Sequence, residues 1–274
     1  EILKKYNFNF QKRFGQNFLH DRHWIERIAK AVNATEGDDI VEIGPGQAAL
    51  TRELIAGAGK VRAVEIDRDL AAWLKETFPE SLSLIEADAL TLDWTQVAKN
   101  DNLRVVGNLP YNISSPLLFK LLEAADHVKD QHFMLQKEVV DRMVAQHGSK
   151  TYGRLSVMLQ WRYRMQKLFD VPPGAFNPPP KVMSSVVRMI PKTKEEVPSV
   201  DFELFSSVVA NAFSQRRKTI RNALSALLSA EEIAACDVDP SARAEALPLD
   251  AFVRLAQKAE ALGRKAVTPG TTVD

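Results

Sequence analysis

Short apolar runs alternate with amphipathic helical stretches from Asp38 to about Ile190, and this alternation constrains the fold more than any other feature. Strands separated by helices at this spacing form parallel βαβ units. We therefore predict an α/β fold with a mostly parallel sheet. The predicted strands are 39–43, 60–66, 82–86, 103–107, 130–135, 165–171 and 182–189, the last two as a closing hairpin. The predicted helices are 48–56, 70–78, 116–125, 137–146 and 154–161.

The pattern changes after Pro191. Residues 192–199 are charged and include Pro198, which is typical of a linker. From Asp201 onward only helical patterns remain, at 202–213, 219–228 and 250–262. We therefore predict two domains, an α/β domain over residues 1–192 and a smaller all-helical domain over residues 193–274.

Composition excludes several classes of protein. An apolar fraction of 45% is too high for an intrinsically disordered chain. Cys236 is the only cysteine, so a disulfide framework and a multi-cysteine zinc site are excluded, and no metal-ligand cluster is visible. No apolar run approaches the length of a membrane span, and residues 1–13 are polar and basic, without the apolar core of a signal peptide. We therefore expect a cytoplasmic protein with no membrane partner, and a monomer.

A glycine-rich turn lies where the first predicted strand meets the first helix, at Gly44-Pro45-Gly46. Glycine allows a sharp turn and a close approach of a ligand. Glu65 ends the second strand, where a carboxylate can accept hydrogen bonds from ribose hydroxyls. Asp88 ends the third strand and can accept from an adenine amino group. These strand ends predict a nucleoside site; the alternative is that both carboxylates are only solvated strand ends.

The same residues favour one kind of nucleoside. Pro45 removes a backbone N–H from the loop, and the third glycine of a dinucleotide motif is replaced by Ala49. No phosphate-binding P-loop motif is present. The acidic residues Glu42, Glu65 and Asp88 suit a cation such as the sulfonium of S-adenosylmethionine, although strand alternation leaves open whether Glu42 faces the site. An NAD-dependent oxidoreductase is the alternative from another class, but no hydride-transfer residue is evident.

Asn108-Leu109-Pro110-Tyr111 follows the fourth predicted strand. The amino group of a nucleobase is a weak nucleophile because its lone pair is delocalised into the ring. An amide oxygen of Asn108 and the Leu109 carbonyl can accept both of its N–H bonds and aim the nitrogen at a methyl donor. Proline has no N–H and keeps the chain extended, and Tyr111 offers a flat face for stacking. An ordinary turn is the alternative.

The Asn108-Leu109-Pro110-Tyr111 motif resembles the signature of amino-group methyltransferases. Further segments resemble one family among them, the ribosomal RNA adenine dimethyltransferases. The resemblance is to the bacterial 16S rRNA branch and covers most of the chain. The segments that carry it are 12–19 (KRFGQNFL), 41–51, 176–182 (FNPPPKV) and 213–222 (FSQRRKTIRN).

The resemblance implies a Rossmann-like, seven-stranded S-adenosylmethionine-dependent methyltransferase sheet. Residues 1–37 would include a segment, 15–19, that covers the cofactor. It implies cofactor contacts for Asn17, Leu19, Gly44, Gly46, Glu65, Asp88 and Asn108. It implies a target-base site formed by Asn108, Leu109, Pro110, Tyr111 and Phe176, with the two aromatic rings on either side of a flipped adenine.

A net charge of only +1 gives no general sign of a nucleic-acid partner, but positive charge is concentrated locally. Arg216, Arg217, Lys218 and Arg221 lie within six residues, and a helix start there would place Arg217 and Arg221 on one face. Because an adenine in structured RNA must leave its stack before N6 is reached, a grip on the backbone is expected. A solvated surface run is the alternative. Further candidates are Lys4, Lys5, Lys12, Arg13, Arg142, Arg154, Arg162 and Arg164.

These features predict an rRNA (adenine-N6,N6)-dimethyltransferase that uses S-adenosylmethionine. The substrate implied by the resemblance is the adjacent adenosine pair in the 3′-terminal hairpin of 16S rRNA, within the 30S subunit or its precursor, with a role in subunit biogenesis. The alternatives are the branch that dimethylates large-subunit rRNA, a mitochondrial homologue that also acts in transcription, and an additional role as an RNA-binding assembly factor.

Overall fold

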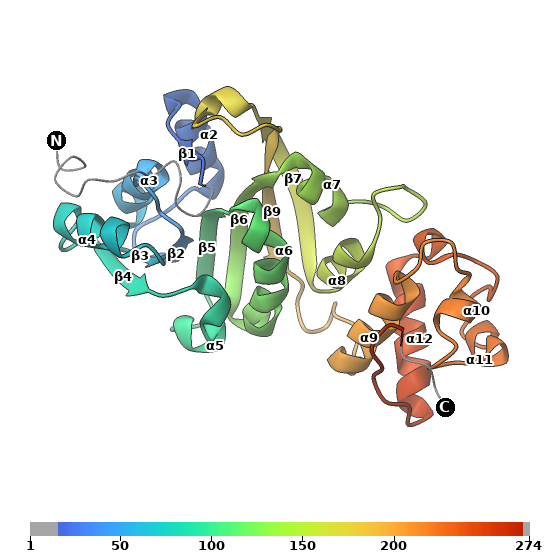
Figure 1. Ribbon diagram of the computed structural model, residues 1–274. Helices are drawn as coiled ribbons and strands as arrows, with labels where there is room; N and C mark the ends of the chain where they lie inside the picture. The colour runs from blue at the N-terminus through green and yellow to red at the C-terminus, as the bar shows by residue number, and fades with distance from the viewer. Residues whose placement is uncertain (1–15, 271–274) are drawn as a thin grey trace. The chain divides into compact units, whose positions relative to one another are not determined.

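A seven-stranded sheet forms the centre of the first part of the chain (Figure 1). The structure is a computed structural model, and it describes residues 16–270. The strand order is β4-β3-β2-β5-β6-β9-β7, which confirms the predicted α/β fold. The strands are β2 (Asp39–Ile43), β3 (Val61–Glu65), β4 (Leu82–Glu86), β5 (Leu103–Asn108), β6 (Val128–Gln136), β7 (Tyr163–Val171) and β9 (Ser184–Pro191).

Strand direction and order place the ligand-binding edge of this sheet. β4, β3, β2, β5 and β6 run parallel, and β9 is antiparallel to β6. The chain builds outward from β2 to β3 and β4, and then returns to place β5 on the other side of β2. The order therefore reverses between β2 and β5, and open parallel sheets bind ligands at the carboxyl ends of the strands at such a point.

Helices α2 (Arg22–Val32), α3 (Ala49–Ala58) and α4 (Arg68–Thr77) bury apolar residues in one core cluster with alternate residues of the strands. Ile40, Val106 and Val186 are strand members of this cluster. Helix α6 (Tyr111–Lys120) follows β5 and contacts β6 (Figure 1). Shorter elements complete this part: β1 (Phe18–Leu19), η1 (Ala89–Thr91), α5 (Trp94–Val97), η2 (Leu121–His127), η3 (Pro173–Ala175) and β8 (Phe176–Asn177).

Helix α2 was not among the predicted elements, although the sequence contains its signals. Asp21 is the N-cap and accepts a hydrogen bond from the His23 backbone N–H. Ile25, Ile28 and Val32 recur at helical spacing and are buried. The helix ends at Asn33, a residue in the left-handed region that commonly terminates helices. α2 therefore follows ordinary capping and periodicity rules.

The described residues divide into two compact units. One contains the chain up to Val140 together with Arg164–Pro191, and the other contains Asp141–Tyr163 and the residues from Lys192 onward. The boundary predicted at 192/193 thus does not account for 141–163, because these residues pack with the helical unit. Whether 1–192 and 193–274 fold as separate domains stays a prediction.

The helical unit is built around aromatic contacts. The Trp161 and Phe205 rings lie 5.5 Å apart, and the Phe213 and Phe252 rings 5.4 Å apart. Its helices are α8 (Arg154–Arg162), α9 (Phe202–Ala212), α10 (Ile220–Ala223), α11 (Ala230–Ala234), η4 (Ala244–Ala246) and α12 (Leu249–Ala261), and α7 (Lys137–Met143) lies at the boundary. The helix predicted over 219–228 is wrong in length, because only the four residues of α10 are helical.

The described residues contain neither a membrane-spanning helix nor a metal-binding cluster. No helix between residues 16 and 270 has the length and apolarity to cross a membrane. Within the same residues, no group of three or more His, Cys, Asp or Glu side chains is arranged to hold a metal ion.

Candidate active site

The glycine loop connects β2 to α3 with an unusual backbone. Gly44 and Gly46 have φ values of 66° and 57°, in the left-handed region that glycine adopts without strain. A Cβ atom on Gly46 would lie 3.0 Å from two ring carbons of Phe18 in β1. Glycine at position 46 is therefore needed for both the turn and the close approach of the β1 segment.

Glu65 ends β3 beside this loop, and its side chain is only partly satisfied. Oε2 accepts the backbone N–H groups of Ile66 and Asp67 at 3.0 and 3.1 Å. Oε1 is buried and has no hydrogen-bond partner among the described residues. Burial raises the pKa of Glu65, whereas the Asp67 and Ile66 amides bonded to Oε2, and the nearby Gly46 amide, oppose that rise. A buried oxygen without a partner is costly, so this atom marks a place for a hydrogen-bond donor.

Glu42 on β2 is also buried, and it accepts a short hydrogen bond from the Thr51 hydroxyl of α3. Burial raises the pKa of Glu42 to about 7; the Thr51 hydrogen bond opposes the rise and the charge of Glu65 adds to it. Glu42 is one of the residues that line the larger of the two cavities described below, and its carboxylate is bonded to α3.

Asp88 lies between β4 and η1, at the same edge of the sheet. Its Oδ1 accepts the Leu90 backbone N–H at 3.0 Å and caps η1. The carboxylate therefore has a structural role in addition to any contact with a ligand. Asp88 still lines a cavity together with Glu65, so the structure brings these two predicted residues together.

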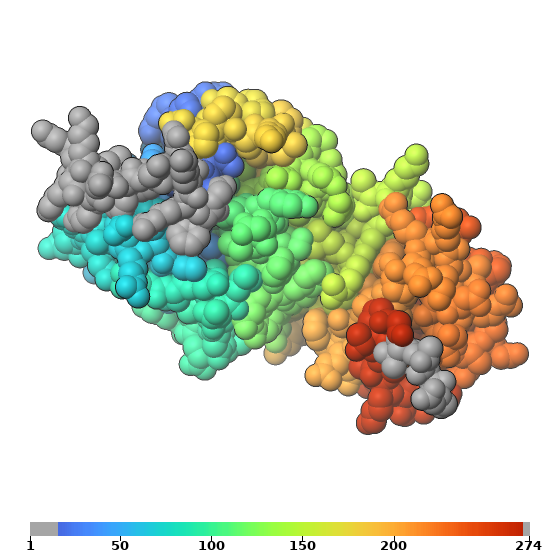
Figure 2. Space-filling model, viewed as in Figure 1, coloured from blue at the N-terminus to red at the C-terminus, as the bar shows by residue number. Residues whose placement is uncertain are grey.

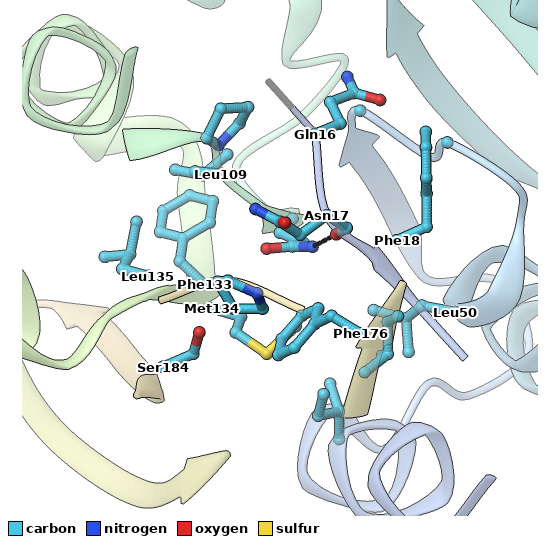
Figure 3. Close-up of a pocket in the computed structure, with 18 of the residues that line it drawn as sticks. Gln16, Asn17, Phe18, Leu50, Leu109, Phe133, Met134, Leu135, Phe176 and Ser184 are labelled. Carbon is cyan, nitrogen blue, oxygen red and sulfur yellow. Dashed lines mark hydrogen bonds between the residues drawn. The ribbon is translucent and has the colours of Figure 1, made fainter. Parts of the chain in front are cut away.

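Asn108 is the last residue of β5, and its amide is oriented by the β1 segment. Nδ2 donates to the Asn17 carbonyl oxygen at 3.2 Å, the hydrogen bond drawn as a dashed line beside Asn17 in Figure 3. Because the amide nitrogen is used in this contact, the acceptor Oδ1 remains for a ligand. The Leu109 backbone N–H donates to the Met134 carbonyl at 3.0 Å and anchors the next peptide to β6. Two acceptors, the Asn108 Oδ1 and the Leu109 carbonyl, are thus held on the sheet.

The two aromatic residues predicted to flank a base differ strongly in exposure. Tyr111 begins α6 and is 63% exposed, whereas Phe176 is 3% exposed. Phe176 is paired with Leu19 in the β1–β8 ladder and belongs to the core cluster. Both rings line the same cavity. Phe176 is therefore a fixed wall with a structural role, and Tyr111 is the accessible ring.

Two adjoining cavities contain all of these residues. The larger, about 580 Å³, is lined by Asn17, Leu19, Gly46, the Asn108–Tyr111 segment and Phe176. The smaller, about 240 Å³, is lined by Glu65 and Asp88. Gln16, Gly44 and Pro110 line both, so the cavities meet at the glycine loop. Every residue predicted for the cofactor or the target base lies at one of them, and Figure 3 shows Asn17, Leu109 and Phe176 at the larger one.

The cavities also include residues that the sequence interpretation missed. Gln16 lies between the two cavities, and Ile66, 47% exposed, lines the smaller one directly after Glu65. His132 of β6 lines the larger cavity and is 2% exposed. Ile66 could have been found, because a residue that follows a strand-end carboxylate lies at the same edge. Nothing in the sequence marks His132 as a site residue, because its strand shows only the pattern of a buried strand.

The predicted RNA-contacting residues lie in the helical unit. Arg216, Arg217, Lys218 and Arg221, the basic cluster, are all exposed, and the orange segment that contains them forms much of that unit's surface in Figure 2. The expectation that Arg217 and Arg221 share a helix face is wrong, because Arg217 lies in a turn before α10. That turn is closed by the Lys218 N–H donating to the Gln215 carbonyl at 3.1 Å, and the Ile220 N–H at the start of α10 donates to the Ala242 carbonyl at 2.7 Å.

Other basic residues predicted to contact RNA are either buried or outside the described part of the chain. Arg162 is 7% exposed and donates to the Lys192 carbonyl at 2.8 Å, so its predicted place on a basic surface is wrong. Lys4, Lys5, Lys12 and Arg13 lie outside the described residues, as does Gly15.

Comparison with known proteins identifies the family. The family model described as "Ribosomal RNA adenine dimethylase" matches residues 7–260. The chain belongs to this family. It is 57% identical over 238 residues to "Ribosomal RNA small subunit methyltransferase A" of Thiobacillus denitrificans, an alignment covering 86% of this chain and 92% of the relative. The protein of the same name from Pseudomonas aeruginosa is 51% identical over 264 residues, 95% of this chain and 98% of the relative.

Two solved structures extend the likeness to the fold. A dimethyladenosine transferase from Plasmodium falciparum has a TM-score of 0.80 at 25% identity, with 91% of this chain and all of that chain covered. The 23S rRNA methyltransferase ErmE has a TM-score of 0.70 at 26% identity, with 89% of this chain and all of that chain covered. The predicted methyltransferase fold of the family is confirmed.

Proposed function

We propose that this protein transfers methyl groups from S-adenosylmethionine to the N6 amines of two adjacent adenosines in the 3′-terminal hairpin of 16S rRNA. Membership of the ribosomal RNA adenine dimethylase family supports the reaction class. Identities of 51–57% to proteins named for the small ribosomal subunit, against 26% to a 23S rRNA enzyme, favour the small-subunit target. The observation that carries the proposal is the Asn108 amide, which the Asn17 carbonyl orients at the larger cavity, two residues before Pro110, which lines both cavities.

The residues at the smaller cavity fit the nucleoside part of S-adenosylmethionine. The buried Glu65 Oε1, which has no partner among the described residues, suits the donor hydrogen of a ribose hydroxyl. Asp88, which lines this cavity, accepts from the adenine amino group, and Ile66 offers apolar surface for the ring. Gly44 and Gly46 let the methionine part pass the loop, and Asn17 and Leu19 cover it. When bound, the cofactor supplies a methyl group on a positively charged sulfonium.

The chain's own contribution to the reaction is orientation and electrostatic stabilisation. Asn108 Oδ1 and the Leu109 carbonyl accept the two N–H bonds of the target amine and direct its lone pair. As the nitrogen becomes positive, the same two acceptors stabilise it. Tyr111 stacks on the exposed face of the flipped adenine, and Phe176 forms the opposite wall. A strong base is not needed, because the amine loses its proton after the methyl group has moved.

We also propose that the basic cluster contacts the RNA backbone, that the protein acts on the 30S subunit or its precursor during subunit biogenesis, and that it is a cytoplasmic monomer. The four exposed charges of the basic cluster support the first part. An overall charge of +1 limits non-specific binding to other RNA, because that binding is electrostatic.

Incubation with labelled S-adenosylmethionine and 30S subunits that lack the modification tests the proposal. We expect label in dimethyladenosine near the 3′ end of 16S rRNA, up to four methyl groups per subunit because each of the two N6 amines takes two. Unmodified 50S subunits provide the control and are expected to remain unlabelled. Label in 23S rRNA, or label in 16S rRNA at a base other than adenine, would contradict the proposal.

A further inference from the structure

Arg104 of β5 is buried and holds the end of a helix that lies far from it in sequence. Its Nε and Nη2 donate to the Asp130 carboxylate at 2.9 and 3.1 Å, and Nη1 donates to Asp38 at 2.8 Å. The remaining hydrogens of the guanidinium reach helix α2: Nη2 donates to the Val32 carbonyl and Nη1 to the Asn33 carbonyl. A buried guanidinium is tolerated only when it is paired and hydrogen-bonded in this way.

Arg188 of β9 makes a second contact with the same helix end. Nη2 donates to the Ala31 carbonyl at 2.9 Å, and Nε donates to His132 Nε2 at 3.0 Å. An imidazole accepts through Nε2 only when it is neutral with its proton on Nδ1. Burial lowers the pKa of His132 to about 4, and this keeps the ring neutral near pH 7.

The carbonyls of 31–33 are therefore all bound from the sheet. The last carbonyls of a helix have no partner within the helix, and cations are favoured there by the helix dipole. Two arginines from different strands meet both needs at α2. The contact is more than a surface cap, because Arg104 is 5% exposed and Ile28 and Val32 of the helix lie in the core.

The other end of the same segment reaches the active site. Leu19 pairs with Phe176, and the His20 N–H donates to the Ala175 carbonyl at 3.0 Å. Immediately before them, the Asn17 carbonyl accepts from Asn108 Nδ2. Residues 17–33 thus form one continuous piece, with the Asn108 contact at its start and the two arginines at its end. Because helix α2 is rigid, a shift at its C-terminal end displaces its N-terminal end as well.

We propose that Arg104 and Arg188 are positioning residues for the transfer reaction. From the sheet they fix the end of α2, and through it the position of the Asn17 carbonyl that orients the Asn108 amide. They touch neither cavity. This inference rests on the proposed function, because the amide that they orient is the one assigned to the target amine. A displacement of about 1 Å at reacting groups can reduce a rate by about 100-fold, so indirect positioning has a measurable effect.

Arg188→Gln and Arg62→Gln form a matched pair for the test. Arg62 of β3 also binds a helix-end carbonyl, that of Val97 at the end of α5, at 2.8 Å, and its second partner is Asp39 at 2.7 Å where Arg188 has His132. Both variants lose a cation that binds a helix-end carbonyl, but of these two arginines only Arg188 contacts the end of α2. Turnover of 30S subunits and backbone hydrogen exchange are measured for both, well below the unfolding temperature of each.

For Arg188→Gln we expect kcat to fall on the order of tenfold with KM for the 30S subunit unchanged, and exchange to become faster over 17–33. Arg62→Gln is expected to lose similar thermal stability but to keep the wild-type kcat and the wild-type exchange over 17–33. Equal kcat in the two variants, or unchanged exchange over 17–33 in Arg188→Gln, would overturn the inference. Arg104→Gln is the second variant, and if it fails to fold, Arg188→Gln decides alone. Loss of the proposed function itself would appear as an inactive wild type, while the exchange measurement would still test the positioning contact.

Discussion

The candidate active site and the basic cluster differ in how firmly the protein holds their side chains. At the active site Glu42, Glu65 and Phe176 are buried and Asn108 is oriented by a hydrogen bond. In the basic cluster all four side chains are exposed, Arg216 donates to the Lys150 carbonyl, and three of the four lie before α10. Group transfer requires acceptors fixed in advance, because their reorganisation would add to the barrier. Contact with an RNA backbone requires only charge near the phosphates. The difference predicts that the two regions control different kinetic quantities.

The largest expected effect is that of Asn108→Ala. Removing a preorganised acceptor that stabilises developing charge typically lowers kcat by about 100- to 1000-fold. We expect that fall here, with little change in the affinity for S-adenosylmethionine measured by calorimetry. Asn102→Ala, at an exposed asparagine just before β5, is the control and should behave as wild type. Unchanged turnover in Asn108→Ala would show that the amine is not held by this residue.

Glu42→Gln tests the burial of charge at the active site. The folded pKa of about 7 exceeds the ordinary value of 4.5, so the folded protein binds this proton more tightly than the unfolded chain does. Stability from this group is therefore fully present below pH about 4.5 and is lost as pH rises through about 7, a loss of about 3 kcal/mol. Glutamine keeps an acceptor for Thr51 and removes the titration. In denaturant unfolding from pH 5 to 8, we expect the wild type to lose stability relative to the variant. Parallel plots of the free energy of unfolding against pH for the wild type and the variant would contradict this.

A smaller effect is expected for Glu65→Gln, on cofactor affinity. Hydrogen bonds to a charged acceptor contribute roughly 2 kcal/mol, so we expect binding of S-adenosylmethionine to weaken by about tenfold or more. Glu86→Gln is the matched control, because Glu86 lies opposite Glu65 in the β3–β4 ladder but is exposed and pairs with Lys75. Equal affinities in the two variants would remove Glu65 from the cofactor site.

The smallest effect per residue is expected in the basic cluster. In Arg217→Ala/Lys218→Ala, the loss of two phosphate contacts should reduce the slope of log affinity against log salt concentration by about 1.5. Lys265→Ala, another exposed cation of the helical unit, should leave the slope unchanged. Filter binding to the 3′-terminal rRNA fragment at several salt concentrations gives this slope. An unchanged slope in the double variant would mean that these charges only solvate the surface.

The same contrast explains which parts of the protein the sequence could predict. The strand ends at Gly44, Glu65 and Asp88 were predictable, because parallel strands bring their carboxyl ends to one edge whatever the detailed packing. The basic cluster was recognisable as charge, but its helical face was not, because only four residues of α10 satisfy helical hydrogen bonding. Short helices depend on tertiary contacts such as that of Ile220 with Ala242, and these leave no periodic signal.

Contacts between distant segments were the least predictable. The burial of Phe176 follows from its pairing with Leu19, and the orientation of Asn108 follows from Asn17, 91 residues earlier in the chain. Neither pairing can be read from local pattern. The arginines that hold α2 were hidden for the same reason, since Arg104 and Arg188 read as single charges within apolar strands.

One steady-state comparison separates catalysis from RNA binding in these two regions. Asn108→Ala and Arg217→Ala/Lys218→Ala are assayed side by side on 30S subunits that lack the modification, with kcat and KM determined for each. We predict that Asn108→Ala lowers kcat with KM for the subunit unchanged, and that the double variant raises KM on the order of tenfold with kcat unchanged. If both variants altered the same quantity, the separation of catalysis from RNA binding proposed for these two regions would be contradicted.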